Sequence, residues 1–429
     1  MSLQKLTSEV NPFRGIRYNP EKVELEKSVA PPYDVISPKE KDQYCLYPYN
    51  ICHLILPGTE YQKAGRLFQE WLEKKYLIQD SALSFYFYTQ EYLDNGISRK
   101  RLGCMGLLRL QETDSGVVLP HEHTLDKPKG DRLSLLRSVQ ANLSPIFGIV
   151  EDQDSLFFNT IKDYISQHPA LFRVSLQAVV HELWQVTQLE VMEAVQQALS
   201  DEKILIADGH HRYESALAYR SERRRERTGY RESNIIAAYD FVMVHFVSAK
   251  DEGLTIWPIH RVLQGGRAAQ TEGIIRELSQ YFEIHNLPSY QLFSELKKSR
   301  ENPQVHGSSF GLYLKGRKSF LLTLQNSSAT ESALKAIPEP MRRLDVSALH
   351  TIVLKQILDH PIDEEHIYFT PSAERAFECV EQEGYEMAFL LNPTPIEQVY
   401  SIASTGARLP QKSTYFYPKL LSGLVINKL

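Results

Sequence analysis

The sequence predicts a protein of mixed α+β class, because strand-like and helix-like patterns alternate along all 429 residues. The composition is that of a globular chain, since 42% of the residues are hydrophobic and 24% are charged. We find no internal repeat and no low-complexity stretch. At about 100–200 residues per domain, the length predicts two or three domains or one large elaborated domain. A disordered or fibrous chain is therefore excluded.

The first half of the chain shows helices and strands by the spacing of its apolar residues. An Asp94-Asn95-Gly96 sequence predicts the turn of a hairpin, and a short apolar run before Asp208-Gly209 predicts a buried strand. In chain order, we expect a helix over 61–76, strands over 85–89 and 103–110, a helix after 131, a strand over 204–207 and a helix from 213.

The second half continues the alternation. The stretch 237–247 reads as a long, mostly buried strand, and Asp345 is expected to be the N-cap of a helix. The compositional change at Gly265-Gly266 suggests a boundary between regions 1–265 and 266–429. The remaining expected elements are helices over 268–282 and 289–299, a hairpin of 310–314 with 319–324, and a strand over 387–391 before an aromatic-rich loop over 410–420.

Charge, cysteine content and hydropathy exclude several classes of protein. With 48 Lys and Arg against 53 Asp and Glu, the charges are too balanced for a protein that coats nucleic acid. The four cysteines form no CxxC pair, which disfavours a disulfide framework or a zinc ribbon. The most apolar long window, 235–247, is shorter than the about 20 residues of a membrane span. We therefore expect a reduced, cytoplasmic protein.

Three polar loops run into predicted helices, and the first is Ala30-Pro31-Pro32-Tyr33-Asp34. It leads into Ser37-Pro38-Lys39-Glu40, which has the pattern of a capping box. Asp34 therefore lies just outside a helix start, in a loop that the prolines stiffen. The pattern fits a catalytic carboxylate, and it equally fits a rigid turn whose aspartate binds local amides.

The second loop, His121-Glu122-His123-Thr124-Leu125-Asp126-Lys127, is followed by Gly130-Asp131-Arg132. In a strand, His121 and His123 would lie on one face, as metal ligands do, but the spacing dictates no third ligand. Glu122 is a candidate general base, and Lys127 and Arg132 are candidate phosphate ligands. A solvated, hydrogen-bonded loop is the alternative.

The third loop, Asp208-Gly209-His210-His211-Arg212, joins a buried strand to a helix. Gly209 permits a positive φ, and the helix start offers amides and a positive dipole end to an anion. Arg212 can bind phosphate oxygens through its forked guanidinium, and the histidines add donors. The sequence therefore predicts a phosphate site without a Walker lysine or a GxGxxG loop. A capped, solvated turn is the alternative.

Two further patterns are open to more than one interpretation. Arginines between 220 and 231 alternate with glutamates, which is typical of a solvated helix face and less often of a nucleic-acid patch. The helices over 268–299 lack the glycine turn and the basic face of a helix-turn-helix. Near the C-terminus, Lys412, Ser413 and Thr414 can bind an anion or belong to a packed closing segment, and His260-Arg261 can line the same pocket.

Several motifs in order resemble the prokaryotic family of domain of unknown function 1015, which implies no established reaction. The resemblance extends from the N-terminus almost to the last residue. It is carried by Pro12-Phe13-Arg14-Gly15-Ile16-Arg17-Tyr18, Pro31-Pro32-Tyr33-Asp34-Val35, His121-Glu122-His123-Thr124, Ala207-Asp208-Gly209-His210-His211-Arg212-Tyr213, and Pro410-Gln411-Lys412-Ser413-Thr414-Tyr415-Phe416-Tyr417-Pro418-Lys419.

The Asp208-Gly209-His210-His211-Arg212 turn also resembles the nucleotide motif of the ParB/sulfiredoxin superfamily, which includes CTP-binding switches, sulfiredoxins and free-serine kinases. This resemblance implies a nucleotide-binding core of that type with large α+β additions, in which the turn holds nucleotide phosphates. The turn contains no cysteine, so sulfiredoxin chemistry is not expected.

Taken together, the motifs predict a nucleotide-dependent phosphotransferase that acts on a small hydroxyl metabolite, with L-serine as the first candidate. ATP or ADP, with CTP as a further option, would be used with Mg²⁺. A ParB-like nucleotide switch and a metal-dependent hydrolase that uses His121, His123, His210 and His211 are the alternatives. The sequence does not reveal the oligomeric state.

The candidate residues are Glu122, Asp34, Lys127 and Arg132 for catalysis, Asp208, Gly209, His210, His211, Arg212, Lys412, Ser413 and Thr414 for phosphate, and His121, His123, Thr124 and Arg14 for substrate.

Overall fold

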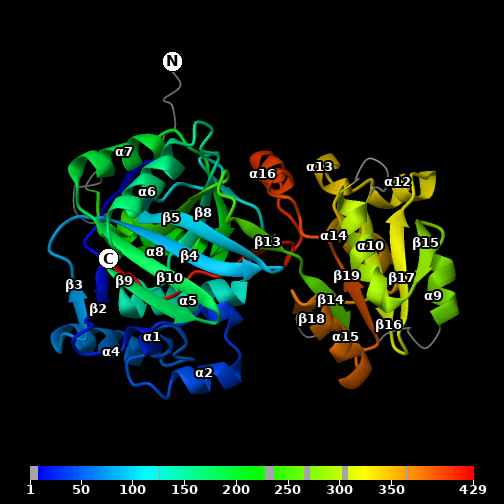
Figure 1. Cartoon of the computed structure of the whole chain (residues 1–429), viewed down its shortest axis with the longest axis horizontal. Coiled ribbons are helices and arrows are strands. Elements are labelled where there is room, and N and C mark those ends of the chain that lie inside the picture. Colours follow the sequence, from blue (N-terminus) through cyan, green and yellow to red (C-terminus); the bar gives the residue numbers. More distant parts are fainter. Residues whose placement is uncertain (1–7, 125, 228–235, 265–270, 302–307, 364–365) are drawn as a thin grey trace. The chain divides into compact units, whose positions relative to one another are not determined.

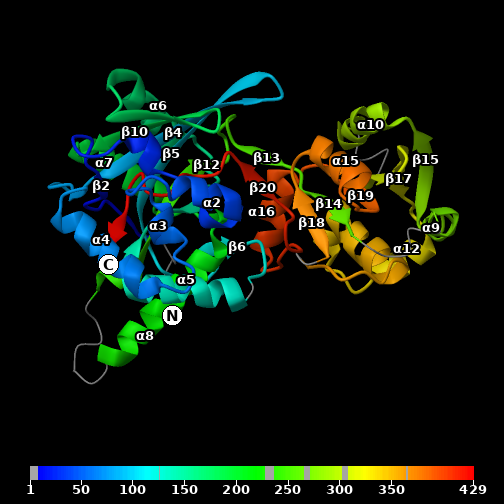
Figure 2. The same ribbon diagram turned by 90° about the horizontal axis from the view of Figure 1, so that it is seen from below.

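The protein is described from a computed structural model that covers residues 8–124, 126–227, 236–264, 271–301, 308–363 and 366–429. The chain divides into two compact units, whose elements are shown from two sides in Figures 1 and 2. Unit 1 consists of Met1–Pro120, Thr124–Thr255 and Pro418–Leu429, and unit 2 of His121–His123 and Ile256–Tyr417. The last twelve residues therefore return to the unit that holds the N-terminal half.

Unit 1 is built on a mixed sheet with the strand order β6-β11-β8-β12-β5-β4-β10-β9, and β1 also pairs with β5. The pairs β6–β11 and β8–β12 are parallel, and the other pairs are antiparallel. The strands of unit 1 are β1 (Val10–Asn11), β2 (Ile16–Tyr18), β3 (Leu77–Gln79), β4 (Phe85–Asp94), β5 (Ile97–Arg109), β6 (Val118–Pro120), β7 (Ala141–Asn142), β8 (Ile146–Val150), β9 (Phe172–Leu176), β10 (Val179–Val186), β11 (Ile204–Asp208), β12 (Phe241–Ser248) and β21 (Asn427–Lys428).

Some helices of unit 1 pack against this sheet, and others pack around a second apolar core that includes the N-terminal segment. Three of them bury apolar side chains against the strands, for example Phe157, Val195 and Tyr213. A second core gathers Phe68 and Trp71 with the N-terminal segment and the C-terminal Ile426. The helices are α1 (Leu25–Ser28), η1 (Tyr33–Val35), α2 (Pro38–Tyr44), α3 (Cys52–Ile55), α4 (Tyr61–Glu73), α5 (Asp126–Val139), α6 (Leu156–Gln167), α7 (Leu189–Leu199), α8 (His210–Arg227) and η2 (Ala238–Asp240).

Unit 2 contains an antiparallel sheet with the strand order β15-β17-β16-β19-β14-β18 and its own apolar core. Its strands are β14 (His260–Leu263), β15 (Phe282–Leu287), β16 (Ser309–Leu314), β17 (Lys318–Leu324), β18 (Ile367–Thr370), β19 (Met387–Leu390) and β20 (Tyr415–Tyr417), which pairs with β13 (Thr255–Trp257). Its helices are α9 (Thr271–Leu278), α10 (Ser289–Glu301), α12 (Ser328–Leu334), α13 (Glu339–Arg342), α14 (Asp345–Ala348), η4 (Leu349–Ile357), α15 (Ala373–Gln382) and α16 (Ile396–Ser404).

Most of the predicted elements are present, so the mixed α+β class is confirmed. The capping box of Ser37 and Glu40 forms at the start of α2. Asn95 and Gly96 have positive φ in the turn between β4 and β5, as expected for that hairpin. Within the described residues, no helix combines the length and the apolar character that a membrane crossing requires.

Two of the expected details are wrong. The strand β15 lies between α9 and α10 and pairs with β17, so the two helices are not joined by a simple turn. Asp345 is not an N-cap, because it lies inside α14 and accepts a hydrogen bond from the amide of Ser309 instead. The boundary predicted at residue 265 lies at the start of a stretch outside the described residues and stays a prediction. Thr255–Ile256 is one of the points at which the chain passes between the two units.

Candidate functional site

The turn between β11 and α8 has the geometry expected of a strand-to-helix anion site. The pairing of β11 with β8 shifts register between Ile206 and Asp208, so an irregularity directly precedes the turn. Gly209 has a φ of +93° and its carbonyl accepts the first helical hydrogen bond, from the amide of Tyr213 at 2.9 Å. Amides at such a helix start have no acceptor within the helix, and the helix dipole favours an anion there.

Asp208 lies between two cations at this turn. Its Oδ2 accepts a hydrogen bond from Nη2 of Arg212 at 2.5 Å, and its Oδ1 accepts one from Nζ of Lys419 at 2.8 Å. Only 12–16% of each of these side chains is exposed. Burial acts to raise the pKa of Asp208, but Lys419 and Arg212 outweigh it and hold that pKa well below its usual value. These three residues, called the Asp208 cluster below, carry two positive charges against one negative charge.

Arg212 is held rigidly within the Asp208 cluster. Its Nη1 donates to the carbonyl of Pro145, while its Nε is buried without a hydrogen-bond partner among the described residues. An unpaired buried donor costs about 1–3 kcal/mol, which an incoming anion would remove by accepting the hydrogen bond. The guanidinium is thus oriented in advance for an oxyanion.

Lys419 reaches the Asp208 cluster because the C-terminal segment is anchored inside unit 1. The side chain of Gln90 donates to the carbonyl of Lys419 at 2.9 Å, and the buried Arg101 donates to the carbonyl of Pro418. The sequence prediction missed Lys419 and chose Lys412 from the same motif. The signal that was available is the position of Lys419 at the end of the same motif, after three aromatic residues and a proline.

The loop that contains Tyr33 lies close to the Asp208 cluster. Tyr33 and Arg212 line a small cavity of about 60 Å³ together with Arg132, Ser144 and Ser215. The guanidinium of Arg132 lies 3.9 Å from the centre of the Tyr33 ring. Burial raises the pKa of Tyr33 far above its usual value, so this phenol stays protonated. The structure thus brings the first and third polar loops of the sequence together in unit 1.

The other candidate residues of unit 1 have diverse surroundings. Arg132 is committed in part, since it donates to Asp131 and to the carbonyl of Ile55. Thr124 donates to Glu214 in the first turns of α8. The side chain of His210 is buried, that of His211 is half-buried, and those of Asp34, Arg14 and Lys127 are exposed.

A second group of candidate residues gathers within unit 2. Nε2 of His121 lies 2.9 Å from the hydroxyl of Thr414, and the carboxylate of Glu122 accepts a hydrogen bond from the amide of Lys412. His121 is buried while His123 is exposed, so the two rings do not share a face as strand geometry would require. Ser413 lines a different cavity of unit 2, which also includes Arg261.

The structure also bears on two other interpretations of the sequence, namely the solvated arginine-rich face and the metal site. Arg220 is not part of a solvated face, because it is buried and donates to the carbonyl of Leu110 and to Glu112. Arg231 lies outside the described residues. In the described part of the chain, no group of three or more His, Cys, Asp or Glu side chains is arranged to hold a metal ion.

Replacement of Gly209 by alanine is expected to destabilise the fold by about 1–3 kcal/mol. The positive φ strains any residue with a side chain, and a Cβ at this position would lie 3.0 Å from Nε of Arg212. Urea unfolding measures the change. Gly130→Ala in α5 is the matched control, since its Cβ would meet nothing within 4 Å. We expect that control to leave stability unchanged or raise it by about 0.5–1 kcal/mol, and equal losses in both variants would contradict the strain argument.

The comparison with protein families decides the classification of the chain. Residues 10–347 match the model of the family described as Protein of unknown function (DUF1015). The chain belongs to this family. The DUF1015 match includes the loops of Tyr33, Glu122 and Arg212 and ends before Lys419. The sequence has no match among the curated proteins.

Similar solved structures include a free serine kinase (E30A mutant) in complex with ADP, at 13% identity and a TM-score of 0.35 over 71% of this chain and 85% of the other. A conserved hypothetical protein from Pyrococcus furiosus has 14% identity and a TM-score of 0.33 over 72% and 90% of the two chains. SbnI with a C-terminal truncation, from Staphylococcus aureus, has 10% identity and a TM-score of 0.35 over 74% and 85%. These scores are too low to transfer a ligand or an activity to the DUF1015 chain.

Proposed function

We propose that this DUF1015 protein binds a nucleoside di- or triphosphate at the start of α8 and transfers its terminal phosphoryl group to a small hydroxyl compound. The observation that carries the proposal is the Asp208 cluster, in which two cations are held beside a helix start. Oriented cations and amides are the main requirement of phosphoryl transfer, which depends chiefly on positioning and on neutralising charge.

In the proposed reaction, the hydroxyl oxygen of the acceptor attacks the terminal phosphorus as the bridging P–O bond breaks. The leaving group is ADP when ATP is the donor and AMP when ADP is the donor. The proton of the acceptor hydroxyl goes to a carboxylate. Arg212 and Lys419 stabilise the negative charge of the phosphate oxygens, with Gly209, His210 and His211 at the same turn. Mg²⁺ would be held mainly by the phosphates with one or two carboxylates, so a complete protein cage is not required.

Within unit 1, Asp34 is the candidate base for the acceptor proton. It is exposed and follows Tyr33, which lines the small cavity beside Arg212 and Arg132. Glu122 is the second candidate, and its carboxylate accepts a hydrogen bond from the amide of Lys412 in unit 2. L-Serine is the first acceptor to test, because the turn resembles the motif of free-serine kinases. The other predicted contacts of the reaction stay predictions, and they are Arg14, His121, His123, Thr124, Lys127, Arg132, Lys412, Ser413 and Thr414.

A transfer assay tests the proposal. We expect purified protein with Mg²⁺ and ATP or ADP to form phosphoserine, or the phosphate ester of another hydroxyl compound in a panel, detected by mass spectrometry. The variants Asp34→Asn and Glu122→Gln separate the two candidate bases. Only substitution of the residue that accepts the proton should lower kcat by about 100-fold or more while nucleotide affinity is unchanged. Nucleotide binding without any phosphorylated product would refute the transferase and favour the nucleotide switch.

A further inference from the structure

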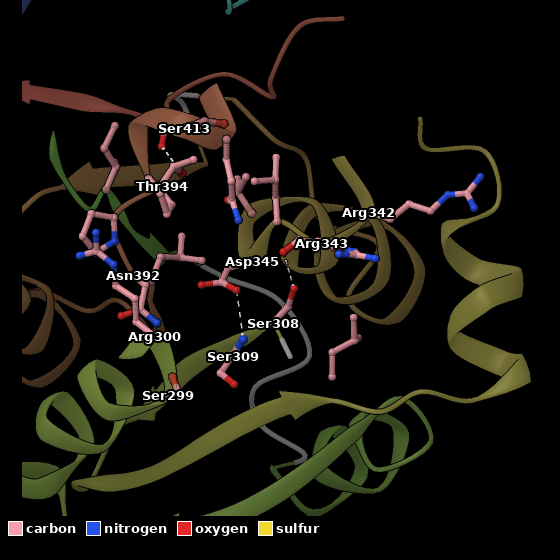
Figure 3. A pocket seen from close by; sticks show the side chains of 18 of the residues that line it. Ser299, Arg300, Ser308, Ser309, Arg342, Arg343, Asp345, Asn392, Thr394 and Ser413 are labelled. Carbon is pink, nitrogen blue, oxygen red and sulfur yellow. Dashed lines mark hydrogen bonds between the residues drawn. The ribbon is translucent and has the colours of Figure 1, made fainter. Parts of the chain in front are cut away.

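Unit 2 contains a cavity of about 640 Å³, within the size range of small-molecule sites. Figure 3 labels polar side chains that line it, which come from the end of α10, the start of β16, the segment from α13 to α14, the loop that follows β19, and Ser413 before β20. All of its lining residues belong to unit 2. No residue of the turn at 208–212 lines it, whereas Ser413, one of the predicted phosphate contacts, does.

The lining of this cavity is strongly basic. It includes four arginines against one aspartate, whereas the whole chain has a net charge of −5. Several guanidinium groups around one cavity repel one another and create a positive potential inside it. An anion that binds there is attracted by this potential and relieves the repulsion. The lining of the cavity therefore carries a charge opposite in sign to that of the protein as a whole, and it suits a negatively charged ligand.

Two of the four arginines have structural roles. Arg342 donates to the carbonyls of Ile337 and Lys335 at the end of α12, at 2.7 and 3.0 Å. Arg261 is only 1% exposed and donates to the carbonyl of Lys412 at 2.9 Å, and its Nε is buried without a partner among the described residues. Burial lowers the pKa of Arg261 to about 9, although the charge of Glu122 acts to raise it. The buried charge of Arg261 adds to the positive potential of the cavity.

The other two arginines, Arg300 and Arg343, are exposed at the cavity and make no side-chain hydrogen bond or ion pair with a residue that the structure describes. In the view of Figure 3, the side chain of Asp345 lies between those of Arg300 and Arg343. Its carboxylate accepts a hydrogen bond from the amide of Ser309 at 3.0 Å. Burial raises the pKa of Asp345 to about 7 despite the bonds from Ser309 and Asn392 and the charge of Arg300. The cavity thus combines two available cations with one acid.

We propose that the cavity of unit 2 binds a small anionic metabolite, whose phosphate or carboxylate groups are bound by Arg300 and Arg343 and whose hydroxyl or ammonium group donates to Asp345. Arg261 supplies fixed positive charge. A guanidinium group binds either oxyanion in a forked geometry, so the class of ligand is set by its anionic groups and the donor that reaches Asp345.

The test is isothermal titration of the full chain with inorganic phosphate, D-3-phosphoglycerate, O-phospho-L-serine and L-aspartate, with glycerol as the neutral probe. We expect at least one anion to bind and glycerol not to bind. In the double variant Arg300→Gln/Arg343→Gln, the affinity for that anion should fall at least 10-fold. The phosphate and carboxylate arms of the panel identify which oxyanion is preferred.

Controls separate this cavity from the nucleotide site and from a loss of folding. Arg276→Gln, an exposed arginine of unit 2 that does not line the cavity, should leave the affinity unchanged. Arg212→Ala in unit 1 should also retain anion binding. Asp345→Asn should weaken binding of the hydroxyl- or ammonium-bearing anions more than binding of inorganic phosphate. The proposal is overturned if no anion binds at millimolar concentration, if the double variant binds as the wild type does, or if Arg212→Ala alone abolishes binding.

Discussion

Replacing Arg212 with alanine is expected to weaken the binding of ATP and ADP by about 30-fold or more, while the chain remains folded. Truncating one partner of a buried, charged hydrogen-bonded pair typically costs about 2–5 kcal/mol, and 1.4 kcal/mol corresponds to tenfold in affinity. In the wild type, Asp208 and the carbonyl of Pro145 hold the guanidinium in place before the nucleotide arrives. Isothermal titration with each nucleotide, with and without Mg²⁺, measures the effect.

Two further substitutions show whether the effect belongs to this guanidinium. Arg223→Ala, on the same helix, removes an arginine whose pair with Glu226 is 42% and 61% exposed, and it should leave affinity and stability nearly unchanged. Arg212→Lys keeps the positive charge but lacks the forked guanidinium that can bind two oxygens at once. This variant should therefore recover only part of the affinity for the nucleotide. If Arg212→Ala binds nucleotide as tightly as the wild type, the phosphate site is not at this turn.

Replacing Asp208 with asparagine is expected to destabilise the protein by about 3–5 kcal/mol, because two poorly exposed cations lose the carboxylate between them. The wild type should also show an acid dependence. The folded-state pKa of Asp208 is lowered from 3.8, so its contribution is fully present above about pH 4 and is lost as the pH falls through the folded-state pKa.

Urea unfolding at neutral pH and at several acid pH values tests this account of Asp208. Below about pH 4, the wild-type free energy of unfolding should fall more steeply than that of Asp208→Asn, since only the wild type has this carboxyl to protonate. The matched control is Glu226→Gln, whose exposed pair with Arg223 should contribute little. Equal stability of the wild type and Asp208→Asn at neutral pH would show that the carboxylate does not hold the two cations together.

Local features of the fold and of the site were predictable from short stretches of sequence. The capping box at Ser37 and the turn at Asn95-Gly96 depend on neighbouring residues alone, as does the strand-to-helix turn at Gly209. Each of these requires a residue type that few alternatives can replace, such as glycine at positive φ. The anion site proposed at the start of α8 therefore depends on five consecutive residues, 208–212.

Features that depend on distant parts of the chain were not predictable in this way. Lys419 pairs with Asp208 across 211 positions, and no periodicity of either segment indicates that partner. The burial of Arg220 depends on the carbonyl of Leu110, and β15 is a strand because β17 pairs with it. A single sequence contains no direct signal of such pairings, so Lys419 was not among the predicted cations, whereas Lys412 stays a prediction.

The most direct measurement of the central claim is a crystal structure of the full chain with ADP and Mg²⁺. The account predicts that the terminal phosphate lies at the start of α8, with its oxygens within about 3 Å of the nitrogens of Arg212, of Lys419 Nζ and of the first-turn amides. Phosphates bound elsewhere in unit 1, or only in the cavity of unit 2, would contradict it.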